Sequence, residues 1–339
     1  MDIRNRNGVR RTAFDALAAN PGKPGLVVLL FIVINTISAL LVTTLLLVLN
    51  NRISQTGGLG DLGLRSILAT IRTVLPMVQT VLLWCVHLGY QNAALRMARR
   101  QAARPRDLLE GFSCFGPLVR SILLRGGIYL MLAFFASYIA STIFLMLPMS
   151  ADFKALTTPL LTDPYAFADS VYADENLFLQ IWETLLPMIP MFLAIFLLVA
   201  APFFYQYRMT NYCILDDPRR GALNAMAESI QMMRRNRVSL LKLDLGFWWF
   251  YLGQAVAAAA LYADWILALA GVTLPLSPVA AHYVCYILSL SLEGILFYFF
   301  LNRVETTYAT VYEILRPKPQ HSGGAVLGNI FDLARDYHE

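Results

Sequence analysis

The feature that most constrains this chain is a series of long apolar stretches separated by polar segments. A helix needs about 20 mainly apolar residues to cross the hydrocarbon core of a bilayer. Six stretches meet or approach this requirement: Leu26–Leu49, Ser66–Asn92, Gly126–Leu147, Ile181–Tyr205, Leu243–Ala270 and Ala280–Asn302. The sequence therefore predicts an all-α polytopic transmembrane helix bundle of about six spans, built as a single integral membrane domain.

The composition excludes an ordinary soluble protein. Hydrophobic residues make up 58% of the 339 residues and charged residues only 14%, whereas a soluble domain usually has about 25% charged residues. The net charge of +5 is attributed to arginine and lysine in the loops, as is usual for a membrane protein. Nucleic-acid binding is the poorer interpretation of this charge.

The basic residues alternate along the chain in a way that predicts orientation. Four segments rich in arginine and lysine alternate with three that are poor in them, and residues 149–180 contain Lys154 as their only basic residue. The positive-inside rule then places both termini in the cytoplasm. We expect a multi-pass membrane protein, with cytoplasmic residues 1–25, a bundle over residues 26–315 and a cytoplasmic tail over 316–339.

A weak internal repeat is visible near residues 90–147 and 205–270. In each half an aromatic and polar span end, "HLGYQNAALRMARR" or "FFYQYRMTNYCIL", is followed by a proline-arginine step at Pro105 or Pro218. An amphipathic stretch and then "RSILLR" or "RVSLLK" lead into the next span. Repeats of this kind occur in transporters and also in membrane folds without transport activity, so both interpretations stay open.

The charged stretch Leu215–Trp249 lies between two apolar stretches and predicts a helix at the cytoplasmic interface. Asp217 can cap the helix, and Pro218 suits its first position because its missing N–H needs no partner there. Apolar residues recur at helical spacing and are expected to face the membrane or the bundle: Leu223, Met226, Ile230 and Met233. Basic residues follow the helix: Arg234, Arg235 and Arg237. Asp217, Pro218 and these arginines are candidates either for an interfacial elbow on anionic headgroups or for a docking surface.

Glu293 is an isolated carboxylate in the middle of the last apolar stretch. A charge in hydrocarbon is costly unless it is paired or hydrated, so we expect this side chain to point into the bundle. It is either a functional carboxylate that couples a proton or cation, or a neutral packing residue.

Motifs of enzyme chemistry are absent from the sequence. There is no HExxH, GxSxG or phosphate-binding glycine loop, and the four histidines are scattered. The four cysteines are isolated and are expected to be packing residues. We therefore expect no catalytic residue, no metal site and no cofactor.

Three blocks of the sequence resemble the DUF975 family of bacterial integral membrane proteins. The main block is "YQYRMTNYCILDDPRRGALNAMAESIQMMRRNRVSLLKLDLGFWW", and the others are "RDLLEGF" (Arg106–Phe112) and "TTYATVYEIL" (Thr306–Leu315). The chain departs from the family pattern at "APFF" (Ala201–Phe204), where the family has a proline-glycine step, and at Arg235-Asn236, where it has Lys-Gly. The resemblance implies the fold and a membrane location, and it implies no biochemical activity.

Two functions fit these observations. The first is a non-enzymatic accessory or scaffold component of the bacterial plasma membrane, whose basic elbows contact anionic headgroups or a membrane or cytoplasmic protein partner. The alternative is a small transporter or permease, with a polar cavity between the half-repeats and Glu293 inside it.

Overall fold

The computed structural model describes residues 3, 5–55, 62–146, 163, 186, 188–269 and 277–316. These residues form helices and connecting turns and contain no strand. Five helices are long and apolar enough to cross a membrane: Pro24–Ile53, Gly63–Ala98, Asp107–Met146, Met188–Asp216 and Ala280–Leu315. The predicted all-α polytopic bundle is confirmed, and these helices indicate a membrane-embedded protein. The predicted start of the fourth span and all of the tail beyond Arg316 lie outside the described residues.

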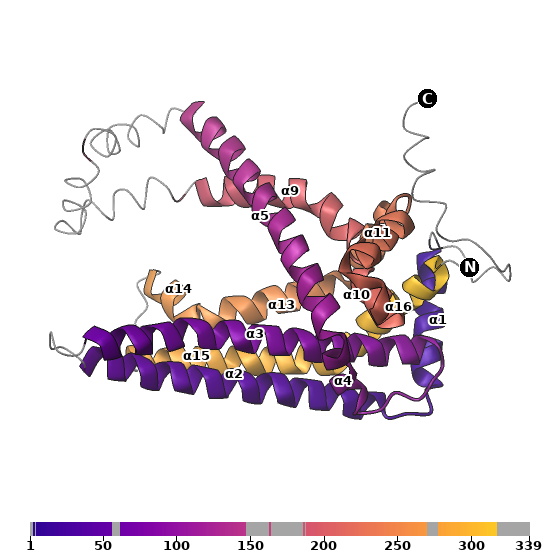
Figure 1. Cartoon of the computed structure of the whole chain (residues 1–339), viewed down its shortest axis with the longest axis horizontal. Coiled ribbons are helices and arrows are strands. Elements are labelled where there is room, and N and C mark those ends of the chain that lie inside the picture. The colour runs from indigo at the N-terminus through magenta and orange to yellow at the C-terminus, as the bar shows by residue number, and fades with distance from the viewer. Residues whose placement is uncertain are drawn as a thin grey trace.

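Two groups of helices make up the apolar part. In the first, α2 (Pro24–Gln55), α3 (Leu62–Ala98) and α15 (Pro278–Leu296) lie side by side, and α13 (Trp248–Leu261) packs on α15 (Figure 1). The second consists of α5 (Phe115–Met146) and α9 (Met188–Gln206), which pack on each other and diverge from the first group. Many large apolar side chains on these helices are exposed, as expected where the surrounding solvent is hydrocarbon.

Both groups meet at one end in a compact assembly, which we call the hub. It consists of the last turns of α3 and of α9 and of shorter elements: α1 (Arg6–Ala18), α4 (Asp107–Glu110), η2 (Gly111–Cys114), α10 (Thr210–Asp216), η3 (Pro218–Arg220), α11 (Gly221–Met233), α12 (Arg237–Asp244) and α16 (Asn302–Leu315). Most of the buried core residues belong to it, including Tyr90, Tyr212 and Tyr308. The hub is therefore the packed core that holds the two groups together.

Two glycines allow α3 to approach α4 and η2 closely. A Cβ added at Gly89 would overlap the backbone carbonyl of Leu108, and one added at Gly111 would overlap the backbone carbonyl of Cys85. Backbone atoms cannot move aside as a flexible side chain can, so both positions require glycine. All four cysteines are buried, and none of them forms a disulfide.

The fifth predicted span, Leu243–Ala270, is not one continuous helix over its described residues. The segment divides into the end of α12, η4 (Leu245–Phe247), α13 and α14 (Ala263–Leu269). The break coincides with Arg10, whose Nη2 donates to the Leu243 carbonyl at 3.1 Å and whose guanidinium lies 4.4 Å from the centre of the Phe247 ring. Among the described residues, five helices rather than six have the length and apolarity of a span.

Candidate functional site

The hub contains a buried polar cluster centred on Asp244, which is 7% exposed at the end of α12. Its Oδ2 accepts a hydrogen bond from the Tyr205 hydroxyl at 2.9 Å, and its Oδ1 accepts one from the Tyr308 hydroxyl at 2.5 Å. The hydroxyls of Tyr308 and Tyr251 lie 2.6 Å apart. These four side chains come from α9, α12, α13 and α16, so the cluster joins elements of both helix groups.

Arg208 lies beside this cluster without a direct ion pair. Its guanidinium stacks over the ring of Tyr308 at 4.2 Å and lies 5.2 Å from the centre of the Phe204 ring. No carboxylate in the described part of the chain is within ion-pair distance of it, and the charges of Glu305 and Asp244 act on it from further away. Stacking on aromatic faces suits the planar, weakly hydrated guanidinium.

Glu305 forms a second buried contact between elements. It is 5% exposed, and its Oε2 accepts a hydrogen bond from the Tyr212 hydroxyl at 2.9 Å. Its Oε1 lies 3.8 Å from Nε2 of His87. The Tyr212 ring also stacks on Tyr312, with ring centres 5.6 Å apart. Glu305 thus connects α16 with α3 and α10.

Ion pairs surround the buried cluster. Arg99 donates to Asp216 at 2.8 Å and to Glu313 at 2.6 Å, and Asp216 also pairs with Arg316 at 2.8 Å. Burial alone would lower the pKa of Arg99, but the hydrogen bonds and charges of Asp216 and Glu313 outweigh it and hold that pKa above its ordinary value. Paired in this way, Arg99 stays charged and ties the end of α3 to α10 and α16.

A separate ion pair fixes the start of the second helix group. Arg96 contacts Asp107 at 3.0 Å and Glu110 at 2.7 Å. Asp107 is fully buried, and its Oδ2 also accepts from the backbone N–H of Arg104 at 2.8 Å. A buried carboxylate needs such partners because leaving it unpaired would be costly.

The helix predicted after Asp217 and Pro218 is present, with a different start. The Asp217 carboxylate accepts from the N–H of Arg219 at 3.1 Å, and Pro218 occupies the first position, as the sequence predicts. A short 3-10 turn, η3, follows, and the α-helix begins only at Gly221, whose φ of 77° favours glycine.

The buried face of α11 includes some of the apolar residues that were predicted to face the membrane or the bundle. Met226 and Met233 are buried as predicted and Ile230 is half-buried, but Leu223 is 68% exposed. Ser229 is also buried on this face. Its hydroxyl donates to the Gln206 carbonyl at 2.9 Å and accepts from the Met209 N–H at 3.2 Å. The prediction followed the large apolar residues and missed this polar anchor.

The three predicted basic anchors have different surroundings. Arg234 and Arg235 are exposed after α11, and their side chains make no ion pair with the described residues. Arg237 is half-buried and donates from Nη2 to the Gln206 side chain at 2.8 Å. Only the first two arginines are therefore free to meet a headgroup or a partner.

Glu293 lies away from the hub. It is half-buried on α15, one turn before Leu296, whose side chain packs over Gly253 of α13. Residues three apart share a helix face, so Glu293 lies on the side of α15 that faces α13. No hydrogen bond or ion pair connects its carboxylate to the rest of the described chain. No group of three His, Cys, Asp or Glu side chains in that part of the chain could hold a metal.

Sequence reasoning missed the Asp244 cluster, although its members carry a signal. Tyr205, Asp244 and Tyr308 each lie near the end of an apolar stretch, where polar groups of different helices can meet. Their pairing could not be read from a single chain because 39 and 64 residues separate Asp244 from the two tyrosines.

One comparison with known proteins gives a match. The family described as "protein of unknown function (DUF975)" matches residues 1–318. The main block that carries the resemblance runs from the end of α9 through α10, η3, α11, α12 and η4 to the start of α13, and the other two form α4 with the start of η2 and most of α16. Most of these elements belong to the hub. No curated protein and no solved structure matches the chain. Since the match covers nearly the whole chain, the protein belongs to the DUF975 family.

Proposed function

We propose that this protein is a non-enzymatic accessory or scaffold component of the bacterial plasma membrane. The observation that carries the proposal is the hub, where the buried carboxylates Asp107, Asp244 and Glu305 are engaged by groups from neighbouring elements. Polar groups bonded to one another hold helices together, whereas a site for a substrate would direct some of them into a cavity.

The physical cost of this arrangement supports a positioning role. Taking charges out of water costs several kcal/mol per ion, and pairing offsets that cost only when the geometry is good. Apolar packing of the same volume would hold the helices equally well, so we infer that the polar hub specifies one arrangement of the two groups. A fixed arrangement is what a scaffold presents to its partner.

The proposed contact surface is the outer face of α11 with its basic end. Leu223 is an exposed apolar residue of α11, and Arg234 and Arg235 follow directly after this helix. Arginines beside a membrane attract anionic headgroups at about 1 kcal/mol each. The surface therefore suits anionic lipid together with a membrane or cytoplasmic protein, and the proposal includes no nucleic acid, cofactor or metal.

A photoreactive side chain at Leu223 tests this surface in living cells. A scaffold should give a discrete protein adduct, and changing Arg234 and Arg235 to glutamine should weaken it severalfold. The control is the same group at Ala225, which is buried on the same helix and should give no such adduct. Equal adducts at both positions, or none at Leu223, would contradict the proposal.

A transporter is the second candidate, because Arg208 and Glu293 lack direct ion pairs among the described residues and the two helix groups diverge (Figure 1). Flux of protons or cations into proteoliposomes separates the two functions. The scaffold proposal expects no flux above that of empty vesicles. Flux that disappears in a folded Glu293→Gln variant would favour the transporter, since an amide cannot ionise.

A further inference from the structure

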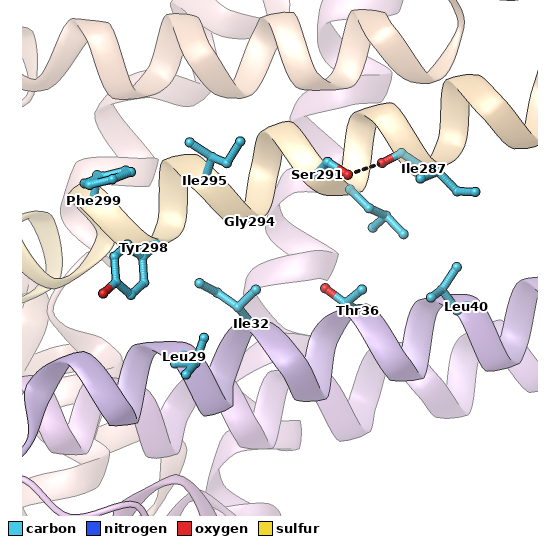
Figure 2. A pocket seen from close by; sticks show the side chains of 11 residues that line it. Leu29, Ile32, Thr36, Leu40, Ile287, Ser291, Gly294, Ile295, Tyr298 and Phe299 are labelled. Carbon is cyan, nitrogen blue, oxygen red and sulfur yellow. Dashed lines mark hydrogen bonds between the residues drawn. The ribbon is translucent and has the colours of Figure 1, made fainter.

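An apolar groove of about 390 Å³ runs between α2 and α15. Figure 2 shows Leu29, Ile32, Thr36 and Leu40 along one wall and residues 287–299 along the other. The Ser291 hydroxyl donates to the Ile287 carbonyl of its own helix at 2.7 Å and is not available to an occupant. The groove therefore offers almost only apolar contact. It is widened at Gly294, where a side chain is absent.

The length of the groove corresponds to one leaflet of a bilayer. Its α2 wall extends from Leu29 to Leu40, about 16 Å at a rise of about 1.5 Å per residue. The hydrocarbon core is about 30 Å thick, so one leaflet contributes about 15 Å. The groove begins near the hub, so a groove of this length would cover about one leaflet on the hub side.

A basic residue follows the groove-lining part of this helix by one turn. Steps of four residues along α15 pass from Ile287 through Ser291, Ile295 and Phe299 to Arg303 in α16, about 6 Å beyond Phe299 along the helix axis. The segment between them, Phe297–Leu301, is π-helical. Such a segment has wider turns and often marks a functional site.

The side chain of Arg303 has no partner of opposite charge among the described residues. It is exposed, lies 5.7 Å from the centre of the Phe14 ring, and lines a small cavity with Phe14, Leu17 and Ala18 of α1. No carboxylate of the described residues pairs with it. A guanidinium with free N–H groups suits a phosphate, which accepts two parallel hydrogen bonds.

We propose that the α2–α15 groove and Arg303 form a binding site for one anionic phospholipid of the hub-side leaflet. One acyl chain lies in the groove, and the phosphate meets the Arg303 guanidinium. The charge of Arg303 and the leaflet length of the groove select this occupant over an uncharged one. The site requires only a membrane-embedded chain and does not rest on the scaffold proposal.

Native mass spectrometry of the full chain, stripped of lipid in mild detergent, tests the site. With added phosphatidylglycerol, one lipid should bind per chain, more tightly than phosphatidylcholine. Arg303→Gln should weaken the binding of phosphatidylglycerol about fivefold, because one interfacial charge contributes about that factor to the affinity. The binding of phosphatidylcholine should not change. The matched control is Arg120→Gln, another exposed arginine near the hub, which should change neither.

A groove-filling variant tests the acyl chain. A Cβ at Gly294 would lie 3.4 Å from the Ile32 side chain. Gly294→Leu should therefore fill the groove and weaken the binding of phosphatidylglycerol and of phosphatidylcholine to the same extent. Ser291→Phe serves if that variant does not fold, and Ala258→Leu on exposed α13 is the control.

Three results would overturn the proposal. The first is that Arg303→Gln binds phosphatidylglycerol as tightly as the wild type. The second is that filling the groove leaves lipid binding unchanged. The third is a dimer that excludes lipid, because the occupant of the groove would then be a second copy of the chain. Inorganic phosphate that competes fully with the lipid would show an anion site without an acyl chain and would also overturn it.

Discussion

The Asp244 cluster gives the most direct test of the hub. Asp244 accepts hydrogen bonds from two tyrosines, and replacing it by asparagine keeps the shape of the side chain but removes the charge. One of its two acceptor atoms becomes an NH2 group that faces a tyrosine hydroxyl. We expect Asp244→Asn to lower the free energy of unfolding without changing which helices form.

The magnitude follows from the two contacts. A hydrogen bond to a charged group contributes about 1.5–3 kcal/mol to stability. Asparagine retains one acceptor, so about one such bond is lost, and the expected change is about 1.5–3 kcal/mol. Tyr308→Phe removes the 2.5 Å bond directly and should cost a similar amount. Since both variants remove the Asp244–Tyr308 bond, the double variant should cost less than the sum of the two single changes.

Unfolding in mixed micelles of mild detergent and sodium dodecyl sulfate measures all three variants. The predicted coupling energy between Asp244 and Tyr308 is at least about 1 kcal/mol. The control is Asp15→Asn, an exposed carboxylate on α1, which should change stability by less than about 0.5 kcal/mol. If the two single effects add within about 0.5 kcal/mol, the residues are independent, and the argument for a hydrogen-bonded hub fails.

Three further predictions concern packing and topology. Gly111→Ala should destabilise the protein by about 1–3 kcal/mol, because its Cβ would overlap backbone of α3; Gly126→Ala has open space, and an equal loss of stability there would refute the close approach. Ile230→Glu should cost about 1–3 kcal/mol, because it brings a charge to a half-buried position, whereas Leu223→Glu should be almost neutral; the reverse order would show that the buried face of α11 is wrong. Single cysteines at Thr157 and Gly324, both outside the described residues, test the expected cytoplasmic termini. An impermeant maleimide added outside the cell should label the cysteine at 157 and leave the cysteine at 324 unlabelled. Labelling of both from the same side would exclude that topology.

The apolar stretches were sufficient to predict five long helices, because a run of apolar residues has few alternatives to a helix in a membrane. The Asp217-Pro218 helix start was equally readable, since capping depends on neighbours in the chain. The break in the fifth stretch was not, because it coincides with Arg10, which lies 233 residues before Leu243. The hub pairs were hidden for the same reason: Arg99 and Asp216 are 117 residues apart, and a single sequence does not show which distant charges meet.

The position of Glu293 relative to the hub bears on the choice between the two functions. Glu293 and Glu305 lie on one continuous helical segment, 12 residues and so about 18 Å apart along its axis. A direct proton transfer requires heavy atoms within about 3.2 Å, and the segment between them is "GILFYFFLNRV", of which only Tyr298, Asn302 and Arg303 have polar side chains. A coupled transporter would need water or groups from other helices to bridge that distance, whereas a scaffold needs no connection. The separation of Glu293 from the polar hub therefore favours a hub that positions helices over one that passes ions to the middle of the membrane.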